Sequence, residues 1–459
     1  MLTLWNTATR SPQEFKPIKK GKVGLYACGP TVYNPPTIGN LRTYVFEDVL
    51  KRTLMLLGYK VKHVMNITDV GHLVGDGDEG EDKVEREAAK QGKTAWDIAK
   101  HYEKLFDADL TRLNIVAPTG KDRPHATDYI KEQIDLVSRL EKEGYTYHTS
   151  DGIYFDTLKF AGYGKLSGQK MDDKEAGARV EINREKRHPA DFALWKFSPK
   201  GAKRQMEWES PWGVGFPGWH IECSAMSEEL LGQPFDIHCG GVDHIPVHHE
   251  NEIAQSEAAF GKPLANYWLH GEFLLVDGGR MGKSEGNAYT LDDLVAKGFD
   301  PLAYRFYCLG THYRSKLNFT WEGLEGAQNA LRKLRHAVRS WEKPKIGCAE
   351  LEAEFVAALE DDLNTPKALA IVWKLVDSDY PASAKAESIL KMDEVLGLGL
   401  AEHVGKPINI PGDVKTLAEE RLIARQSKDW KKSDELREAI KEKGWIVEDT
   451  KEGYELSPS

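Results

Sequence analysis

The segment Gly21-Lys-Val-Gly-Leu-Tyr-Ala-Cys28 is a short apolar stretch that ends in the turn Gly29-Pro30. From Leu41 to Leu57 apolar residues recur at helical spacing, and Tyr59 to Ile67 alternates in polarity as a strand does. Strand, loop, helix and strand in this order predict a βαβ unit of a Rossmann-type α/β fold. The glycine-containing loop leads into the helix N-terminus, where free backbone N–H groups and the helix dipole favour a phosphate.

The rest of the chain predicts additional domains around this unit. Strand-like segments return at Phe235 to His238 and at Asn266 to His270, so the first Rossmann half is interrupted and then resumed. Helical patterns separated by prolines follow, and two helices with a hairpin are expected at the C-terminus. The predicted segments are a first Rossmann half (1–113), an inserted domain (114–200), a second Rossmann half (201–310), an α-helical bundle (311–404), and a linker with a small α+β module (405–459).

Composition favours a cytoplasmic enzyme. The chain has 459 residues, 41% of them hydrophobic, which is ordinary for a globular protein. The net charge of -10 excludes a global basic field, so any RNA contact must use local patches. The five cysteines lack the dense pattern of a disulfide scaffold, which favours a reducing compartment. The N-terminus shows no leader pattern and no apolar run is long enough for a membrane span.

Four residues from three distant regions could together bind one metal ion. His248 and Glu252 are four apart, which places both side chains on one face of a helix, and Cys28 and Cys223 add two thiolates. Zinc accepts S, N and O donors, and a site with few fixed ligands keeps a position open for chemistry. Spacing alone leaves open that the cysteines are buried as small apolar residues and that His248 and Glu252 lie at the surface. Cys239 is interpreted as a spectator thiol rather than a ligand.

A second candidate is the loop from Val276 to Asn287. It contains three glycines before Lys283, and Arg280, Lys283 and Ser284 could contact a polyphosphate whose charge grows as a bond breaks. Taken alone, the loop is more readily interpreted as a solvated surface loop with a charged tip.

The order of the motifs identifies a family. Thr37-Ile-Gly-Asn40, Gly218-Trp-His-Ile-Glu-Cys223, His248-His-Glu-Asn-Glu252 and Arg280-Met-Gly-Lys-Ser284 together resemble class I aminoacyl-tRNA synthetases, and specifically the cysteinyl-tRNA synthetase family. The resemblance continues through Asp361-Asp-Leu-Asn-Thr-Pro366 and Asp449-Thr-Lys-Glu-Gly453, so it spans nearly the whole chain. It implies activation of L-cysteine with ATP and Mg²⁺, followed by transfer to tRNA(Cys).

The resemblance also implies roles for single residues. Cys28, Cys223, His248 and Glu252 would bind one Zn²⁺, whose open position would take the sulfur of cysteine, so that serine is rejected without editing. Thr68 and Trp219 would lie beside the bound amino acid, with His220, His238 and His249 as a polar floor. Ile38, Gly39, Lys283 and Ser284 would bind ATP. The catalytic contacts would come from Lys283, Arg280, Thr37 and Asn40, with Lys283 as the main transition-state cation.

Two motifs depart from the family pattern. Thr37 and Asn40 replace the two histidines of His-Ile-Gly-His, and Gly282 replaces the serine in the middle of Lys-Met-Ser-Lys-Ser. Asn40 can still donate a hydrogen bond to phosphate, and both cationic positions of the second motif are kept. Both motifs are therefore weakened, and neither is lost.

Contacts with tRNA are expected from the inserted domain at the acceptor end and from the C-terminus at the anticodon. Trp430 and Trp445 could stack on unpaired bases, although both could instead be core residues. Two stretches each carry a local charge of about +4: 331–343, with Arg332, Lys333, Arg335, Arg339 and Lys343, and 421–432, with Arg421, Arg425, Lys428, Lys431 and Lys432.

The resemblance implies a monomer. The competing hypotheses are a ligase that joins cysteine to a small amine and a non-catalytic paralogue that binds tRNA or cysteine. The C-terminal module argues against the first, and the retained Gly39, Lys283 and metal ligands argue against the second.

Overall fold

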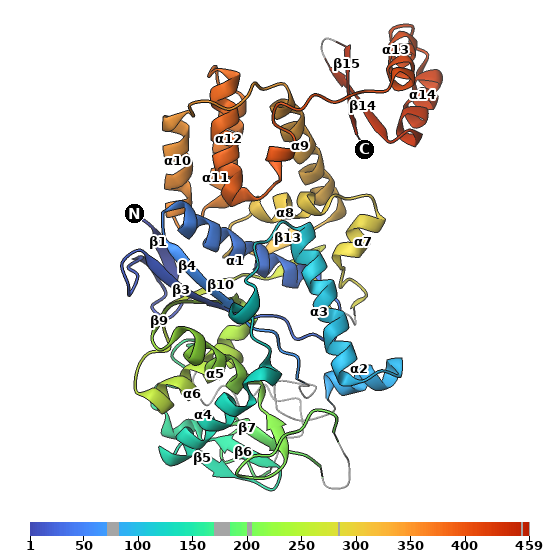
Figure 1. Cartoon of the computed structure of the whole chain (residues 1–459). Coiled ribbons are helices and arrows are strands. Elements are labelled where there is room, and N and C mark those ends of the chain that lie inside the picture. Colours follow the sequence, from blue (N-terminus) through green and yellow to red (C-terminus); the bar gives the residue numbers. More distant parts are fainter. Residues whose placement is uncertain (71–81, 169–183, 200–203, 283–284, 451–452, 459) are drawn as a thin grey trace.

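A four-stranded parallel sheet forms the centre of the catalytic half (Figure 1). The computed structural model describes residues 1–70, 82–168, 184–199, 204–282, 285–450 and 453–458. The sheet has the order β10-β9-β3-β4, built from β10 (Ala265–Gly271), β9 (Phe235–Gly241), β3 (Lys22–Ala27) and β4 (Lys60–Met65). Helix α1 (Ile38–Leu56) connects β3 to the parallel, adjacent β4, so the predicted βαβ unit is confirmed.

Hydrophobic burial explains how α1 is oriented. Leu41, Val45 and Val49 recur at helical spacing and are almost fully buried in the core that also contains Leu25, in β3. Each such side chain stabilises the fold by about 1.5–3 kcal/mol when it leaves water. The N-terminus of α1 consequently lies at the carboxyl ends of the strands, the edge at which open α/β sheets bind ligands.

The inserted domain is an antiparallel sheet of order β5-β6-β7-β8 with one long helix. Helix α4 (Ile130–Lys142) packs on α5 (Trp219–Leu231) and α6 (Glu250–Phe260) through a second hydrophobic core. The last strand, β8, ends at Pro217, beyond the boundary at 200 expected from the sequence, and leads through Gly218 directly into α5. The strands are β5 (Thr146–His148), β6 (Gly152–Phe155), β7 (Phe192–Phe197) and β8 (Gly215–Pro217).

Smaller elements surround the two sheets. Helices α2 (Lys83–Gln91) and α3 (Ala95–Arg112) precede the insert, and α7 (Leu291–Ala296) and α8 (Pro301–Leu309) lie at the end of the second half. The remaining strands are β1 (Thr3–Asn6) and β2 (Ser11–Glu14), which form a hairpin, and β11 (Leu274–Val276), β12 (Gly279–Arg280) and β13 (Leu317–Phe319), which form a three-stranded sheet. The short helical turns are η1 (Gly120–Asp122), η2 (Ala126–Tyr129), η3 (Thr157–Lys159), η5 (Val242–His244), η6 (Ile245–His249) and η8 (Leu400–Glu402).

The C-terminal part is helical, as the sequence predicts. The bundle contains α9 (Trp321–Arg339), α10 (Ala349–Glu360), α11 (Thr365–Val376) and α12 (Ala382–Leu396). The final module contains α13 (Gly412–Gln426), α14 (Trp430–Glu442) and the hairpin β14 (Trp445–Thr450) with β15 (Gly453–Pro458), and it follows the bundle on its linker (Figure 1). Glu455 Oε2, in β15, lies 3.6 Å from His336 Nε2, in α9. No helix in the described part of the chain is both long and apolar enough to cross a membrane.

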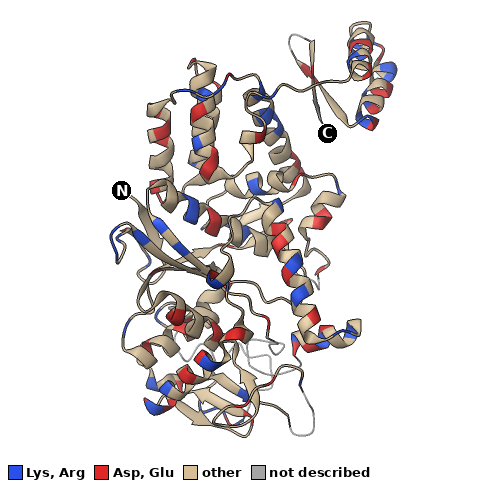
Figure 2. Cartoon of the chain, viewed as in Figure 1, with Lys and Arg blue, Asp and Glu red and all other residues tan. Residues whose placement is uncertain are grey.

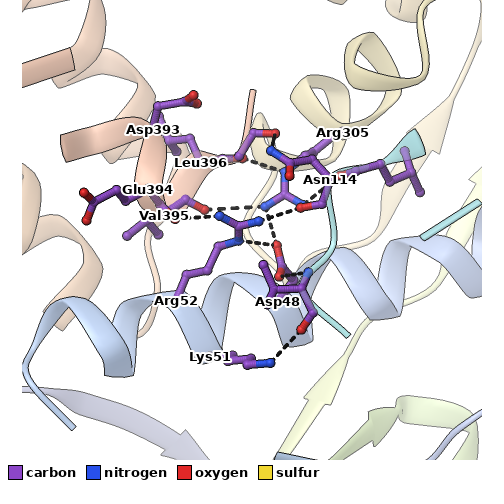
Figure 3. A network of polar contacts seen from close by, with 12 residues as sticks. Asp48, Lys51, Arg52, Asn114, Arg305, Asp393, Glu394, Val395 and Leu396 are labelled. Carbon is purple, nitrogen blue, oxygen red and sulfur yellow. Dashed lines mark hydrogen bonds and ion pairs between the residues drawn. The ribbon is translucent and has the colours of Figure 1, made fainter. Parts of the chain in front are cut away.

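A buried polar network joins α1 to the bundle (Figure 3). Arg305 of α8 is inaccessible to solvent and donates to Asp48 of α1 at 2.6 Å and to the carbonyl oxygen of Leu396 at 2.5 Å. Arg52 of α1 bridges the same carboxylate and the Glu394 carbonyl oxygen. Gly397 allows this approach, because a β-carbon there would lie 2.7 Å from the guanidinium of Arg305, and its φ of +65° favours glycine.

Candidate active site

The four predicted metal ligands converge on one point. The ligand atoms of Cys28, Cys223, His248 and Glu252 all lie within 4.8 Å of one another, and all four residues are buried. Cys28 directly follows β3, Cys223 lies in the second turn of α5, and Glu252 lies in the first turn of α6. His248 Nε2 lies 3.2 Å from Glu252 Oε1, so the spacing of four does place both side chains on one face. We call these four residues the ligand quartet.

A second set of donors overlaps the ligand quartet. Cys28 and Glu252 also lie within 4.8 Å of His238 and His249. His249 Nε2 is 3.3 Å from Cys28 Sγ, and its Nδ1 is 2.8 Å from the Nε2 of His270. His238 Nε2 is 3.0 Å from Glu252 Oε2. His249, expected from the family to lie beside the amino acid, therefore contacts a member of the quartet.

The surrounding turn is unusual in its backbone. Residues Ile245–His249 form a single π-helical turn, η6, immediately before α6. Single π turns inside helices occur frequently at functional sites because they turn side chains away from the ordinary α-helical directions. His248 and His249 lie in this turn and are both nearly inaccessible to solvent.

Burial dominates the electrostatics of the site. Burial raises the pKa of the Cys28 thiol well above its usual range, and the adjacent Cys223 and Glu252 raise it further. Burial likewise lowers the pKa of the His249 imidazole well below its usual range. In the absence of a cation the site therefore favours the neutral forms of the Cys28 and Cys223 thiols and of the His249 imidazole. A divalent cation would reverse this preference for the thiols.

The predicted amino-acid contacts lie next to the quartet or to residues that touch it. The half-buried ring of Trp219 lies 4.7 Å from that of His248, centroid to centroid, and His220 Nδ1 is 3.0 Å from His248 Nδ1. Thr68 Oγ1 donates to Glu222 Oε2 at 3.0 Å and accepts from Asn66 Nδ2 at 3.1 Å. The structure thus brings Thr68, Trp219, His220 and His249 close to the quartet or to residues that contact it.

Thr37 and Asn40 form a helix cap at the start of α1. The backbone N–H of Asn40 donates to Thr37 Oγ1 at 3.3 Å, and Asn40 Oδ1 accepts from the Thr37 backbone at 3.0 Å and from its hydroxyl at 2.8 Å. This is a reciprocal capping box. It occupies the Thr37 hydroxyl and the Asn40 oxygen, and leaves the Asn40 amide hydrogens for an acceptor outside the helix.

The loop from β12 onward contacts the same helix end. A β-carbon on Gly39 would lie 2.3 Å from Met281 Cε, so glycine allows Met281 to pack against the first turn of α1. The backbone N–H of Ile38 donates to the Tyr289 carbonyl oxygen at 2.8 Å, which fixes the far end of the loop. Arg280 is exposed in β12, and its carbonyl oxygen accepts from Asn287. The predicted ATP contacts Lys283 and Ser284 lie outside the described residues.

Ion pairs within the protein reduce the positive charge that the two basic stretches, 331–343 and 421–432, can offer to RNA. Arg335 pairs with Asp300 at 2.5 Å, and Arg421 and Arg425 both pair with Asp449. Sequence charge therefore overestimates what these helices offer to RNA, and acidic side chains alternate with basic ones over the C-terminal module (Figure 2). Of the two tryptophans, Trp430 is 57% exposed, whereas Trp445 packs partly against the core of the module.

Two residues between the metal ligands were not predicted. Glu250 and Asn251 are almost fully buried and bind a loop of the inserted domain rather than the quartet. In the sequence, only their position inside His248-His-Glu-Asn-Glu252 marks these two residues, and that position does not indicate which residues they contact.

Comparisons with known proteins agree with this geometry. The family described as tRNA synthetases class I (C) catalytic domain matches residues 14–329, and the DALR domain matches residues 354–401. The fold and site thus define a class I aminoacyl-tRNA synthetase. Cysteine--tRNA ligase 1 of Burkholderia lata is 52% identical over 99% of this chain and 96% of its own length. The Cysteine--tRNA ligases of Treponema denticola and Thermus thermophilus are 45% and 44% identical, each over 98% of both chains.

The chain belongs to the cysteine--tRNA ligase family. More distant solved structures share its fold. Methionyl-tRNA synthetase of Mycobacterium tuberculosis, in complex with methionyl-adenylate, aligns with a TM-score of 0.53 at 16% identity, over 83% of this chain and 91% of that one. The LeuRS of Agrobacterium radiobacter, in a ternary complex with tRNA and LeuAMS, aligns with a TM-score of 0.56 at 13% identity, over 85% of both chains.

Proposed function

We propose that the chain activates L-cysteine with ATP and transfers the cysteinyl group to the 3′ end of tRNA(Cys). The observation that carries the proposal is the convergence of the ligand quartet at the carboxyl edge of the central sheet. Relatives named for this activity, which match this chain over 98–99% of its length, support it. We expect the enzyme to act as a cytoplasmic monomer.

The residues of the quartet fit a zinc ion. Glu252 is fully buried, and its side-chain oxygen lies within 4.8 Å of two cysteine sulfurs and an imidazole nitrogen, the S, N and O donors that zinc accepts. The quartet is favoured over the overlapping set because it offers two cysteine sulfurs, the soft ligands that select zinc, whereas the overlapping set offers one. Bound zinc would stabilise a thiolate and thereby distinguish cysteine from serine.

The chain's own residues would hold cysteine and ATP next to each other. Trp219 and Thr68 would enclose the amino acid, and Glu222 would keep the Thr68 hydroxyl in place. The Asn40 amide at the α1 N-terminus would donate to phosphate, and Arg280 and Lys283 would neutralise charge that develops as pyrophosphate leaves. Magnesium would accompany the nucleotide as part of the substrate.

The inserted domain and the C-terminal module are proposed to bind tRNA. The insert (114–200 in the sequence, extended to Pro217 by its sheet) would contact the acceptor end, and the module would contact the anticodon through Trp430. The module argues against a ligase for small amines, which would have no use for it.

Three measurements on the purified full chain test the proposal. We expect about one zinc per chain, cysteine-dependent exchange of pyrophosphate into ATP, and charging of a tRNA(Cys) transcript. A chain that binds tRNA but gives no exchange would be the non-catalytic paralogue. Cys223→Ala should lose both zinc and the preference for cysteine over serine, and retention of both would contradict the role of the quartet.

A further inference from the structure

The start of α6, between His248 and Glu252, also holds a loop of the inserted domain. Glu250 is 1% exposed, and its two carboxylate oxygens accept from the backbone N–H groups of Gly164 at 2.7 Å and of Ser167 at 2.9 Å. The neighbouring Asn251 accepts from the hydroxyl of Tyr163 at 2.6 Å. We call these three hydrogen bonds the clamp.

The clamp attaches the loop of the inserted domain to α6, the helix that also carries Glu252 of the quartet. His248 and Glu252 point to the quartet, while Glu250 and Asn251, between them in sequence, point to the insert. Hydrogen bonds from backbone amides to a buried carboxylate are charge-assisted and therefore stronger than neutral ones. Leu166 adds an apolar anchor, because it is buried in the same core as Cys223.

The clamped loop presents positive charge. Lys165 lies between the two clamped residues Gly164 and Ser167 and is exposed. Burial raises the pKa of the Glu257 carboxyl and the charge of Lys165 offsets part of this rise, but Lys165 forms no ion pair within 4.0 Å with the residues that the structure describes. The guanidinium of Arg10 lies against the same loop, since a β-carbon on Gly168 would come within 1.8 Å of its Nη2. An exposed cation on a loop that is fixed to the start of α6, between His248 and Glu252 in sequence, suits a polyanion better than a small neutral ligand.

We propose that the clamp positions Lys165 to bind a backbone phosphate near the 3′ end of tRNA during cysteinyl transfer. This inference rests on the proposed function. In the transfer step a hydroxyl oxygen of the terminal ribose bonds to the cysteinyl carbonyl carbon, the bond from that carbon to the AMP oxygen breaks, and the hydroxyl proton leaves with AMP. Lys165 is a binding residue in this step, and Glu250 and Asn251 are positioning residues that act through the loop.

Activation of cysteine and transfer to tRNA can be measured separately. Their ratio distinguishes a role in tRNA binding from a general loss of folded enzyme. Lys165→Met should lower the ratio of transfer to pyrophosphate exchange about tenfold, mainly through the KM for tRNA. It should also reduce the slope of log affinity against log salt by about 0.7, the value for one phosphate contact to a single strand. Glu250→Gln replaces one acceptor oxygen by an NH₂ group that faces a backbone N–H, and should lower the same ratio about tenfold through the rate of single-turnover transfer.

Further variants keep the test decisive if Glu250→Gln folds poorly. Tyr163→Phe deletes one hydroxyl of the clamp from the insert side and should lower the ratio about threefold with normal zinc content. Lys142→Met and Glu229→Gln, exposed charges on α4 and α5, are the matched controls and should leave the ratio unchanged.

The inference is overturned if Lys165→Met transfers with the wild-type ratio and salt slope, or if Glu250→Gln and Tyr163→Phe lower exchange as much as transfer. Absence of cysteine-dependent exchange in the wild-type chain would instead overturn the proposed function.

Discussion

Asp48 should be among the most sensitive residues for stability in this chain. Its carboxylate is fully buried between two guanidiniums, with Oδ2 at 2.6 Å from Arg305 Nη2 and 2.7 Å from Arg52 Nε (Figure 3). Asp48→Asn keeps the side-chain oxygen that accepts from the Val116 backbone. With that oxygen in place, the amide NH₂ group of the variant takes the position of Oδ2, opposite the two guanidiniums, and the negative charge is lost.

The structure allows the loss to be estimated. Removing one partner of a buried ion pair costs about 3–5 kcal/mol, because the remaining charge stays buried and uncompensated. Here both arginines keep carbonyl partners, Leu396 for Arg305 and Glu394 for Arg52, and Arg52 is partly exposed. We therefore expect about 3 kcal/mol, a large part of the roughly 5–15 kcal/mol that stabilises a folded domain.

Urea unfolding followed by circular dichroism measures this loss. Glu354→Gln is the matched control, because it makes the same carboxyl-to-amide change in a surface pair with Lys374 and should cost at most about 1 kcal/mol. The reasoning is refuted if Asp48→Asn shifts the unfolding midpoint no more than this control does. Arg305→Met combined with Asp48→Asn should be less destabilising than the sum of the two single changes, since the double variant removes both charges of that pair.

Three other changes have defined outcomes. Cys28→Ser should lower bound zinc well below one per chain, with cysteine-dependent exchange lost in parallel; metal analysis checks this, and full zinc occupancy would remove Cys28 from the quartet. Trp430→Ala should raise the KM for tRNA about tenfold through loss of about 1–3 kcal/mol of stacking, without changing exchange; an unchanged KM would make Trp430 a surface residue without function. Burial raises the pKa of Asp109 to about 6, so the folded state holds a proton that the unfolded state releases, and stability falls as the pH rises from about 4 to 6. Asp109→Asn should abolish this fall and raise the melting temperature at pH 7.5 by a few degrees, and a lower melting temperature would show that the ion pair with Arg112 outweighs the cost of burial.

The spacing of apolar residues predicted the helices of the bundle well, because each helix forms with one apolar face buried against its neighbours. The helices that the proline-separated apolar patterns of 311–404 predict are present as α9, α10, α11 and α12. Proline at helix starts and apolar residues at three-to-four spacing are local signals, so a single sequence contains them. The C-terminal module of two helices and a hairpin is confirmed for the same reason.

Partners across the fold could not be predicted in this way. The spacing of His248 and Glu252 indicated a shared face, but nothing in the sequence connects Glu250 to Gly164 or Asp48 to Arg305, which are separated by 86 and 257 residues. The positive charge that 421–432 offers to RNA was overestimated for the same reason. The guanidinium of Arg421 pairs with Asp449, 28 residues away. Such pairings depend on the tertiary arrangement, which local propensity does not encode.

Helix α1 links these separate findings. Its first turn replaces the two histidines of the family motif by a capping box, which uses the backbone N–H of Asn40 inside the protein. The N–H of Ile38 is also occupied, by Tyr289. In the described structure the Gly39 N–H and the Asn40 amide are then the donors that the first turn can offer to a phosphate. A binding site with so few donors depends on where the helix end lies, and the buried pair of Asp48 and Arg305 fixes α1 against the bundle. The Asp48→Asn variant should therefore raise the KM for ATP in the folded fraction as well as lower stability.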